Sequence, residues 1–312
     1  MKIGLDIMGG DYAPKATVLG AIAAHKVLTA GQRLVLIGDR ELTESILREN
    51  NADPGLFDFM HTTEVIGMGE HPTKAIVQKP DSSISVGFKM LKEGSIDAFC
   101  SAGNSGAMLV GAVFSVKSIP GVLRPAITSI MPKLEEGLGI LVDVGANADC
   151  KPEYLVQFGV FGSLFAKHVY NIPEPRVALV NIGEEEEKGN LLCQAAFPLM
   201  KDNPLINFVG NAEGRDMFSG MADVFVCDGF TGNVMLKFAE SFYVISRKKG
   251  IKDDFFDKFN YEQYGGSPIL GVNAPVVVGH GISNAEAVKN MVLLCRDMVE
   301  SALTEKIKLA FQ

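Results

Sequence analysis

Strand-like and helix-like patterns of apolar and polar residues alternate along the chain. Apolar residues occupy every second position in Lys2–Met8, and Pro14 then suits the first turn of a helix. Arg33–Gly38 has the pattern of a second strand and Arg40–Asn50 that of a second helix. Short apolar runs that suit buried parallel strands follow at 98–101, 139–144, 176–182, 207–210 and 223–227. The alternation predicts a layered α/β fold with helices on both sides of a sheet, and residues 284–311 add one long amphipathic helix or two short ones.

Size, hydropathy and charge argue against a membrane-spanning, secreted or nucleic-acid-binding protein. The 312 residues suffice for one large α/β domain or for two lobes that share a core. No apolar run reaches the roughly 18 to 20 residues that a membrane span requires. No secretory signal pattern precedes the first strand, so we expect a cytoplasmic location. The net charge of −8 disfavours broad nucleic-acid binding, which requires clustered lysines and arginines.

The spacing of cysteines, histidines and aspartates does not support a metal centre. The cysteines are odd in number, lie far apart and form no CxxC pair, so we expect small core residues at Cys100, Cys150, Cys193, Cys227 and Cys295. The histidines show no HExxH or HxxxH spacing. Aspartates occur near several strand ends, but their spacing fits no known metal-binding loop: Asp6, Asp11, Asp143, Asp149 and Asp228. We therefore expect no metal and no cofactor.

Five glycine-rich polar turns follow predicted strands and are the candidates for ligand binding. They are DIMGGD (6–11), SAGNSG (101–106), DVGAN (143–147), NIGEEEEKGN (181–190) and DGFTGN (228–233). In an open parallel sheet, ligands bind outside the carboxyl ends of the strands. Glycine lets the backbone approach a ligand closely, and a following helix N-terminus offers N–H groups to an anion. GxGxxG and GxxxxGK[ST] are absent, so nucleotide binding has no motif support.

Three residues in or beside these turns have alternative interpretations. Lys188 follows four glutamates and either holds a phosphate or an oxyanion as a point charge or belongs to a solvated charged loop. Arg215, in NAEGRD (211–216), either clamps a phosphate or forms an ion pair with Asp216 or Glu213. Ser105 lacks the GxSxG context of a serine nucleophile, so we expect it to cap a helix.

As an ordered set, these turns resemble the phosphate acyltransferase family of bacterial phospholipid synthesis. The matching stretches run along nearly the whole chain: IGLDIMGGDYAP (3–14), KPDSS (79–83), SAGNSG (101–106), RPA (124–126), VDVGANADCKP (142–152), 182–190, VGNAEGRD (209–216), CDGFTGNVMLK (227–237), YGG (264–266) and APVVVGHGISN (274–284). The resemblance implies a three-layer α/β/α sandwich similar to isocitrate and isopropylmalate dehydrogenases, with a mostly parallel sheet that has an antiparallel part. It also implies a single domain over residues 1–312 and a homodimer.

The family reaction implies transfer of a fatty acyl group from acyl carrier protein to inorganic phosphate. The product, acyl phosphate, would supply a membrane glycerol-3-phosphate acyltransferase. Because phosphate is already an anionic nucleophile, it can attack the thioester directly, without a covalent acyl-enzyme. The alternatives are phosphotransacetylase-like transfer from acyl-CoA and a non-catalytic scaffold for carrier protein. A dehydrogenase has only the analogy of the fold in its favour.

Site residues follow from the same resemblance. Lys188 would stabilise phosphate or the oxyanion, Asn233 would polarise the carbonyl, and Asp228 would orient one of these two side chains. The substrate-binding positions would be Asn104, Ser105, Gly106, Arg215, Gly232, Asp6, Gly9 and Gly10.

The segment at about 242–264 combines a basic run with aromatic residues. Arg247, Lys248, Lys249 and Lys252 precede aromatic residues that we expect to be exposed: Phe255, Phe256, Phe259, Tyr261 and Tyr264. We expect a protruding segment that contacts acidic carrier protein, lies weakly on an anionic membrane surface, or is only a solvated helix end. Family members usually carry two longer helices here, so the 28 residues from Lys237 to Tyr264 imply a shortened hairpin.

Overall fold

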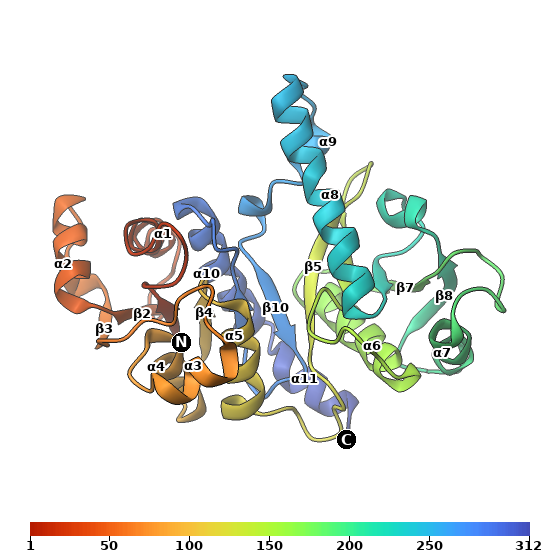
Figure 1. Cartoon of the computed structure of the whole chain (residues 1–312), viewed down its shortest axis with the longest axis horizontal. Coiled ribbons are helices and arrows are strands. Elements are labelled where there is room, and N and C mark those ends of the chain that lie inside the picture. Colours follow the sequence, from red (N-terminus) through yellow and green to blue (C-terminus); the bar gives the residue numbers. More distant parts are fainter. The chain divides into compact units, whose positions relative to one another are not determined.

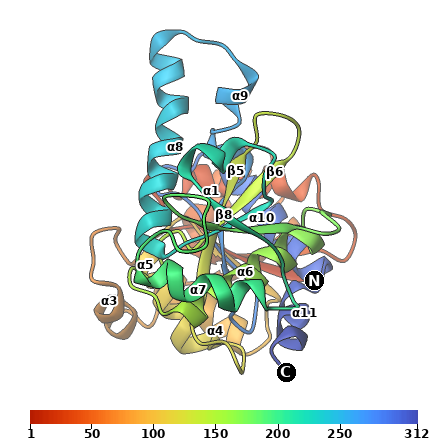
Figure 2. The ribbon, with the colours of Figure 1, turned by 90° about the vertical axis from the view of Figure 1, so that its right-hand side faces the viewer.

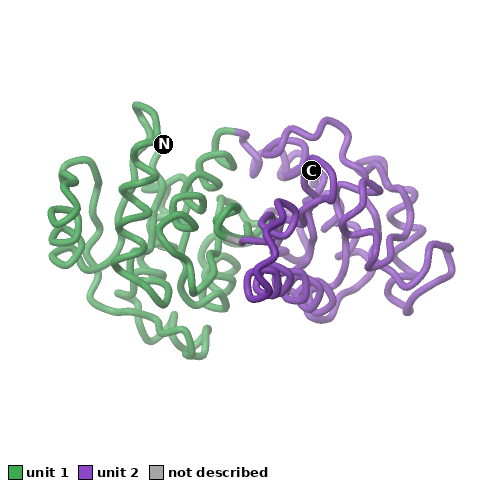
Figure 3. The backbone as a smooth tube through the Cα atoms, turned by 90° about the horizontal axis from the view of Figure 1, so that it is seen from above, with its two compact units in different colours: residues 1–118, 261–300 green, residues 119–260, 301–312 purple. Residues whose placement is uncertain are grey.

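The computed structural model describes the whole chain except the side chain of Tyr261. The backbone forms two compact units, which Figure 3 colours separately: unit 1 comprises residues 1–118 and 261–300, and unit 2 comprises residues 119–260 and 301–312. Whether these two units form the single domain predicted for residues 1–312 is not decided by this division, and the single domain stays a prediction.

Unit 1 contains a mostly parallel sheet with the strand order β3-β2-β1-β4-β11-β10. The strands are β1 (Lys2–Asp6), β2 (Arg33–Gly38), β3 (Asp58–His61), β4 (Ala98–Ser101), β10 (Ser267–Leu270) and β11 (Val276–Val278). The helices are α1 (Lys15–His25), α2 (Arg40–Glu49), α3 (Pro72–Gln78), α4 (Ser83–Lys92), α5 (Ser105–Gly111) and α10 (Ala285–Glu300), with the short turns η1 (Pro54–Leu56), η2 (Ala112–Val116) and η4 (Tyr261–Gln263). β10 runs antiparallel to β11. Phe99 packs against α4 while its neighbour Cys100 contacts Cys295 of α10, so helices cover both faces.

Unit 2 contains a second mostly parallel arrangement with the strand order β5-β6-β9-β7-β8. The strands are β5 (Ala126–Pro132), β6 (Leu138–Val142), β7 (Arg176–Val180), β8 (Asn207–Ala212) and β9 (Val224–Val226). The helices are α6 (Pro152–His168), α7 (Leu191–Lys201), α8 (Gly229–Lys249), α9 (Asp254–Asp257) and α11 (Leu303–Ala310), with the turn η3 (Gly214–Phe218). β5 and β6 form an antiparallel pair, and β6, β9, β7 and β8 run parallel. Figure 1 shows these elements along the chain.

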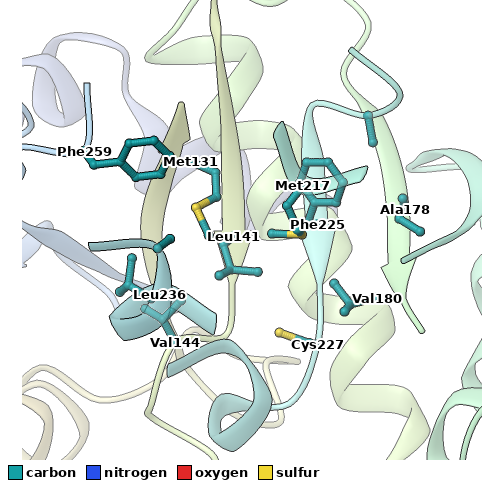
Figure 4. Close-up of a cluster of buried hydrophobic side chains, with 13 residues drawn as sticks. Met131, Leu141, Val144, Ala178, Val180, Met217, Phe225, Cys227, Leu236 and Phe259 are labelled. Carbon is teal, nitrogen blue, oxygen red and sulfur yellow. The ribbon is translucent and has the colours of Figure 1, made fainter. Parts of the chain in front are cut away.

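The two faces of the sheet in unit 2 carry different helices. Successive residues of a strand point to opposite faces. In β9, Val224 faces Gly162 of α6, whereas Phe225 belongs to a buried cluster with Leu236 of α8. Figure 4 shows this cluster, in which Leu141, Phe225 and Leu236 lie among the strands and α8. Gly159 of α6 lies beside Met200 of α7 and Val177 of β7, so α6 and α7 lie on one face and α8 on the other, which makes three layers.

These elements confirm the predicted fold class. The sheet is mostly parallel with antiparallel pairs, and helices cover both faces. The strands at 33–38 and 98–101 have the predicted bounds, and most other predicted elements differ by one to three residues at their ends. Residues 284–311 form two helices, because Ala302 adopts a left-handed conformation between α10 and α11. Cys100, Cys227 and Cys295 are buried as expected, whereas Cys150 and Cys193 are only half-buried.

The segment at 242–264 differs from the expectation of exposed aromatic rings. Helix α8 ends at Lys249, and after α9 the chain places Phe259 in the core of unit 2, with Phe255 partly buried beside it. Lys258 Nζ donates hydrogen bonds to the carbonyl oxygens of Lys133 and Glu135 in the β5–β6 hairpin. The prediction was wrong for Phe255 and Phe259 because both rings pack edge-to-face against Phe218.

The remaining aromatic residues and the basic run complete this segment. Phe256 and Tyr264 are half-buried rather than exposed, and the prediction for the ring of Tyr261 lies outside the described residues. The basic residues are exposed, as expected: Arg247, Lys248, Lys249 and Lys252. Figure 2 shows α8 continuing past the β5–β6 hairpin, with α9 next to it. No helix among the described residues combines the length and the apolar character needed to cross a membrane.

Candidate functional site

A pocket of about 420 Å³ opens at the carboxyl ends of β7 and β9 in unit 2. β7 leads into α7 on one face of the sheet, and β9 leads into α8 on the other. Such a point, where successive connections leave in opposite directions, is where open α/β sheets bind ligands. The lining residues are Leu155, Val180, Asn181, Ile182, Gly189, Asn190, Leu192, Cys193, Gly214, Cys227, Asp228, Thr231 and Met235. The turns at 181–190 and 228–233 thus meet, as their positions after parallel strands predict.

Asp228 lies in the wall of this pocket and caps helix α8. Its carboxylate accepts a hydrogen bond of 2.8 Å from the Thr231 backbone N–H and another of 2.7 Å from the Thr231 hydroxyl. Aspartate at an N-cap satisfies a backbone donor and complements the positive end of the helix dipole. Asp228 therefore fixes the start of α8, the helix that carries Gly232 and Asn233.

Lys188 is exposed in the loop at 181–190. Two of the four glutamates before it pair with other cations: Glu186 lies 2.5 Å from Lys201, and Glu184 lies 3.9 Å from Arg215. In the part of the chain that the structure describes, Lys188 forms no ion pair. Its ammonium group is therefore available to an anion from solution.

Three amide side chains, which the sequence did not reveal, hold this loop in place. Asn181 Nδ2 donates to the Lys188 carbonyl oxygen and to Asn211 Oδ1, both at 3.1 Å. Asn211, only 2% exposed, donates to the Glu185 carbonyl oxygen at 2.8 Å. Gln194 donates to the carbonyl oxygens of Glu187 and Gly189. The backbone at Lys188 is thus fixed from β7, β8 and α7 at once.

Gly232 and Asn233 lie near the start of α8, against the turn at 143–147. Asn233 is exposed, and its Nδ2 donates to the Val144 carbonyl oxygen at 3.1 Å, which leaves its second N–H for a ligand. Gly232 is buried, and a Cβ there would lie 2.9 Å from Cys227 Sγ and would overlap the Asp143 carbonyl oxygen. Glycine at this position therefore permits close packing of helix and turn.

Asp143 organises the turn that supports α8. Its buried carboxylate accepts hydrogen bonds from the backbone N–H groups of Ile127, Ala146 and Asn147 at 2.7–3.1 Å. Burial raises the pKa of the Asp143 carboxyl, although these hydrogen bonds act in the opposite direction. Within the described residues, no group of three or more His, Cys, Asp or Glu side chains is arranged to hold a metal ion.

Arg215 is exposed and already paired. Its guanidinium forms a close ion pair with Glu213 and lies 3.9 Å from Glu184. Of the two interpretations of this residue, the ion pair with Glu213 is therefore present in the structure. The phosphate contact stays a prediction.

The predicted positions of unit 1 meet around a buried carboxylate. Asp6 is 1% exposed and accepts hydrogen bonds from Ser101 Oγ at 2.6 Å and from the Met8 N–H at 2.9 Å. Burial raises the pKa of the Asp6 carboxyl. A Cβ at Gly9 would lie 2.6 Å from the Gly103 backbone nitrogen, so Gly9 allows the turns after β1 and β4 to touch. This geometry favours a supporting role for Asp6.

The turn at 101–106 is held in place by hydrogen bonds to the segment at 67–70 of unit 1. Asn104, 4% exposed, donates to the carbonyl oxygens of Gly67, Met68 and Glu70, and its Oδ1 caps α5 by accepting from the Ala107 N–H. The prediction that Ser105 caps this helix was therefore wrong, because Asn104 does so and Ser105 is exposed.

Glycines shape the approach to this turn in unit 1. Gly106 packs against Pro72 so closely that a Cβ would overlap the proline ring. Gly10 has a φ of +106°, a conformation that favours glycine, and a Cβ there would lie 3.1 Å from the Gly281 carbonyl oxygen. Both glycines therefore serve close packing, and their contact with phosphate stays a prediction.

Comparison with known proteins identifies the family. The model of a family described as "Fatty acid synthesis protein" matches residues 1–306. The phosphate acyltransferase of Dictyoglomus turgidum is 42% identical, with 98% of this chain and 96% of the relative covered. That of Desulforamulus reducens is 43% identical over 99% of this chain and 96% of its own length.

Solved structures share the fold. A phosphotransacetylase from Streptococcus pyogenes superposes with a TM-score of 0.68 at 17% identity, with 96% of this chain and 94% of that chain covered. A 4-hydroxythreonine-4-phosphate dehydrogenase from Klebsiella pneumoniae reaches 0.59 at 13% identity, with 95% and 98% covered.

The three-layer fold, its strand-end turns and these relatives together define an acyltransferase. Within that class, the chain belongs to the phosphate acyltransferase family.

Proposed function

We propose that the protein transfers a fatty acyl group from acyl carrier protein to inorganic phosphate and so produces acyl phosphate for phospholipid synthesis. The observation that carries the proposal is the pocket of unit 2. Its apolar lining lies between the start of α8 and the loop at 181–190, in which Lys188 is not engaged in an ion pair among the described residues. Family membership supplies the reaction class.

The reaction is a direct displacement at the thioester carbonyl. A phosphate oxygen forms a bond to the carbonyl carbon, and a tetrahedral oxyanion results. The C–S bond then breaks, and the carrier thiolate leaves with the electron pair and takes a proton from water. Lys188 neutralises charge on phosphate or on the oxyanion, and the second N–H of Asn233 polarises the carbonyl. Asp228 acts through the first turn of α8, and Arg215 is the further phosphate contact.

The thiols near the pocket support a mechanism without an acyl-enzyme. Burial raises the pKa of the Cys227 and Cys193 thiols, and nearby Asp228 adds to both shifts. Burial, aided by Asp143, raises the pKa of Cys150 to about 12. The thiolate is the nucleophilic form of cysteine, so all three are poor nucleophiles at neutral pH.

Partners and location follow from the same proposal. Carrier protein, which is acidic in this family, requires a local basic surface because the chain itself has a net charge of −8. The exposed residues Lys248 and Lys249 at the end of α8 provide one, and Arg247, exposed but 3.7 Å from Asp257, lies beside them. We further propose a cytoplasmic homodimer that delivers its product to a membrane glycerol-3-phosphate acyltransferase.

Removing the charge of Lys188 tests the assignment. Lys188→Ala should lower kcat/KM for phosphate-dependent release of carrier thiol by on the order of 100-fold, because a preorganised charge at the oxyanion is lost. Its melting temperature should be unchanged. Lys201→Ala removes an exposed charge beside the same loop and is the matched control, with near-normal turnover expected. Normal turnover in a folded Lys188→Ala protein would contradict the assignment.

The acyl donor is tested in the same assay. Acyl carrier protein and acyl-CoA of equal chain length are compared at several phosphate concentrations. Preference for acyl-CoA would favour phosphotransacetylase-like transfer. Carrier binding without phosphate-dependent thioester cleavage would favour a scaffold.

A further inference from the structure

We propose that the pocket of unit 2 binds the acyl chain itself, with the reacting carbonyl at the rim formed by the loop at 181–190 and the start of α8. This inference rests on the proposed function and adds the place where the chain is held. The volume of about 420 Å³ falls within the range of roughly 300–1,000 Å³ that is usual for small-molecule sites.

The chemistry of the lining favours a hydrocarbon. Leu155, Val180, Leu192 and Met235 contribute apolar side chains from α6, β7, α7 and α8, and Ile182 of the loop after β7, 78% exposed, lies at the rim. The two thiols of the lining are protonated at neutral pH and behave as small apolar groups. Four separate elements therefore present apolar surface to one volume.

The polar side chains of the lining are already engaged. Asp228 and Thr231 are hydrogen-bonded to each other at 2.7 Å. Asn190 Oδ1 accepts from the Cys193 N–H at 2.9 Å, and Asn181 binds the Lys188 carbonyl oxygen. A polar ligand such as a nucleotide would have to displace these bonds, whereas an alkyl chain needs no partner. Each methylene that the pocket buries should raise affinity by up to about fourfold.

A second, wider pocket of about 740 Å³ provides an internal comparison. It shares Asn190, Leu192, Asp228 and Thr231 with the first pocket but contains Cys150 in place of Cys193. Leu191 and Phe230, which also line it, are 85% and 67% exposed. An alkyl chain would gain less there, because much of its surface would stay in water.

The two half-buried thiols allow the pockets to be distinguished. Because burial raises the pKa of both thiols, wild-type protein is treated with excess iodoacetamide at pH 9 for long enough to alkylate each cysteine without ligand. The same reaction is run with dodecylphosphonate or with methylphosphonate, and alkylation of each cysteine is followed by mass spectrometry. We expect dodecylphosphonate to slow the reaction of Cys193 at least fivefold and to leave Cys150 unchanged. Methylphosphonate should protect neither. Equal protection of both thiols, protection of Cys150 alone or no protection would overturn the inference.

A filled pocket provides an independent test. Met235→Trp places a large ring in the lining, whereas Val234→Trp puts the same ring on the neighbouring, 54% exposed position of α8. With acyl carrier proteins of 8 and 16 carbons, Met235→Trp should lower the turnover ratio of long to short chains at least tenfold. Val234→Trp should keep the wild-type ratio. An unchanged ratio in folded Met235→Trp would contradict the inference. If wild-type protein cleaves no thioester at all, the proposed function fails. The protection of Cys193 from alkylation then decides by itself whether the pocket binds an alkyl chain.

Discussion

Replacing Gly232 by alanine should destabilise unit 2 and misplace the start of α8. A Cβ would lie 2.9 Å from Cys227 Sγ and 3.0 Å from the Asp143 carbonyl carbon, and it would overlap the Asp143 oxygen. Alanine in a helix gains up to about 1 kcal/mol over glycine. Overpacking of a well-packed site costs about 1–3 kcal/mol, and here the obstacle is backbone that cannot rotate away. The overlap with backbone places the cost at the upper end, about 2–3 kcal/mol, so the net loss is about 1–2 kcal/mol.

Two measurements test this expectation. Thermal unfolding should shift to lower temperature by about 2–8 °C, at roughly 2–4 °C per kcal/mol for a domain of this size. The value of kcat/KM should fall on the order of 10- to 100-fold, because Asn233 moves with the helix and small displacements of reacting groups are costly.

Gly159→Ala is the matched control. Gly159 lies inside α6, and a Cβ there would meet Met200 Cε and Val177 Cγ1 at 3.4 Å, an ordinary van der Waals distance. This variant should be as stable as the wild type or more stable by up to about 1 kcal/mol. Full stability and activity of Gly232→Ala would refute the reasoning, because the close approach of helix and turn would then have no consequence.

Other features lead to further expectations. Asn211→Ala removes two hydrogen bonds of a buried side chain and should lower the free energy of local unfolding of the loop at 181–190 by about 1–3 kcal/mol. Proteolysis at Glu184–Lys188 should then be faster. Unchanged cleavage would contradict a role of the amide network. Activity should survive exhaustive EDTA treatment, and a rate that returns only with Mg²⁺ would contradict this. Binding to anionic vesicles should be marginal and weakened by salt, and it should disappear when Arg247, Lys248 and Lys249 are replaced by alanine. Tight, salt-resistant binding would point to another surface.

The sequence predicted those parts of the fold that depend on local pattern. Runs such as 98–101 and 176–180 are buried on both faces, so their apolar composition alone marks them as strands. Strands β3, β5, β10 and β11 were missed. β3 is a four-residue strand with Asp58 and His61 at its ends, β5 mixes Thr128 and Ser129 with apolar residues, β10 contains Pro268, and β11 has only three residues. β5, β10 and β11 lie in antiparallel pairs, where a partner rather than composition defines the strand.

The candidate site was predicted only in part. Glycine turns after strands revealed the turns at 181–190 and 228–233, which meet at one pocket. The roles of Asn181 and Asn211 depend on a contact across 30 positions, which no local pattern contains. Phe255 and Phe259 looked exposed beside the charged residues around them, but both rings pack against Phe218, which buries Phe259 and partly buries Phe255.

Helix α8 also sets a distance. It begins at Asp228 in the wall of the pocket and carries Arg247 near its other end, 19 residues later, so about 28 Å separates the two at 1.5 Å per residue. A carrier protein bound at the basic end of α8 must therefore hold its thioester on an arm long enough to span this distance. A carrier that lies along the side of the helix, where Phe238 and Val234 are exposed, would need only about half the length. The length of α8 therefore limits where a donor can dock while its thioester reaches the pocket.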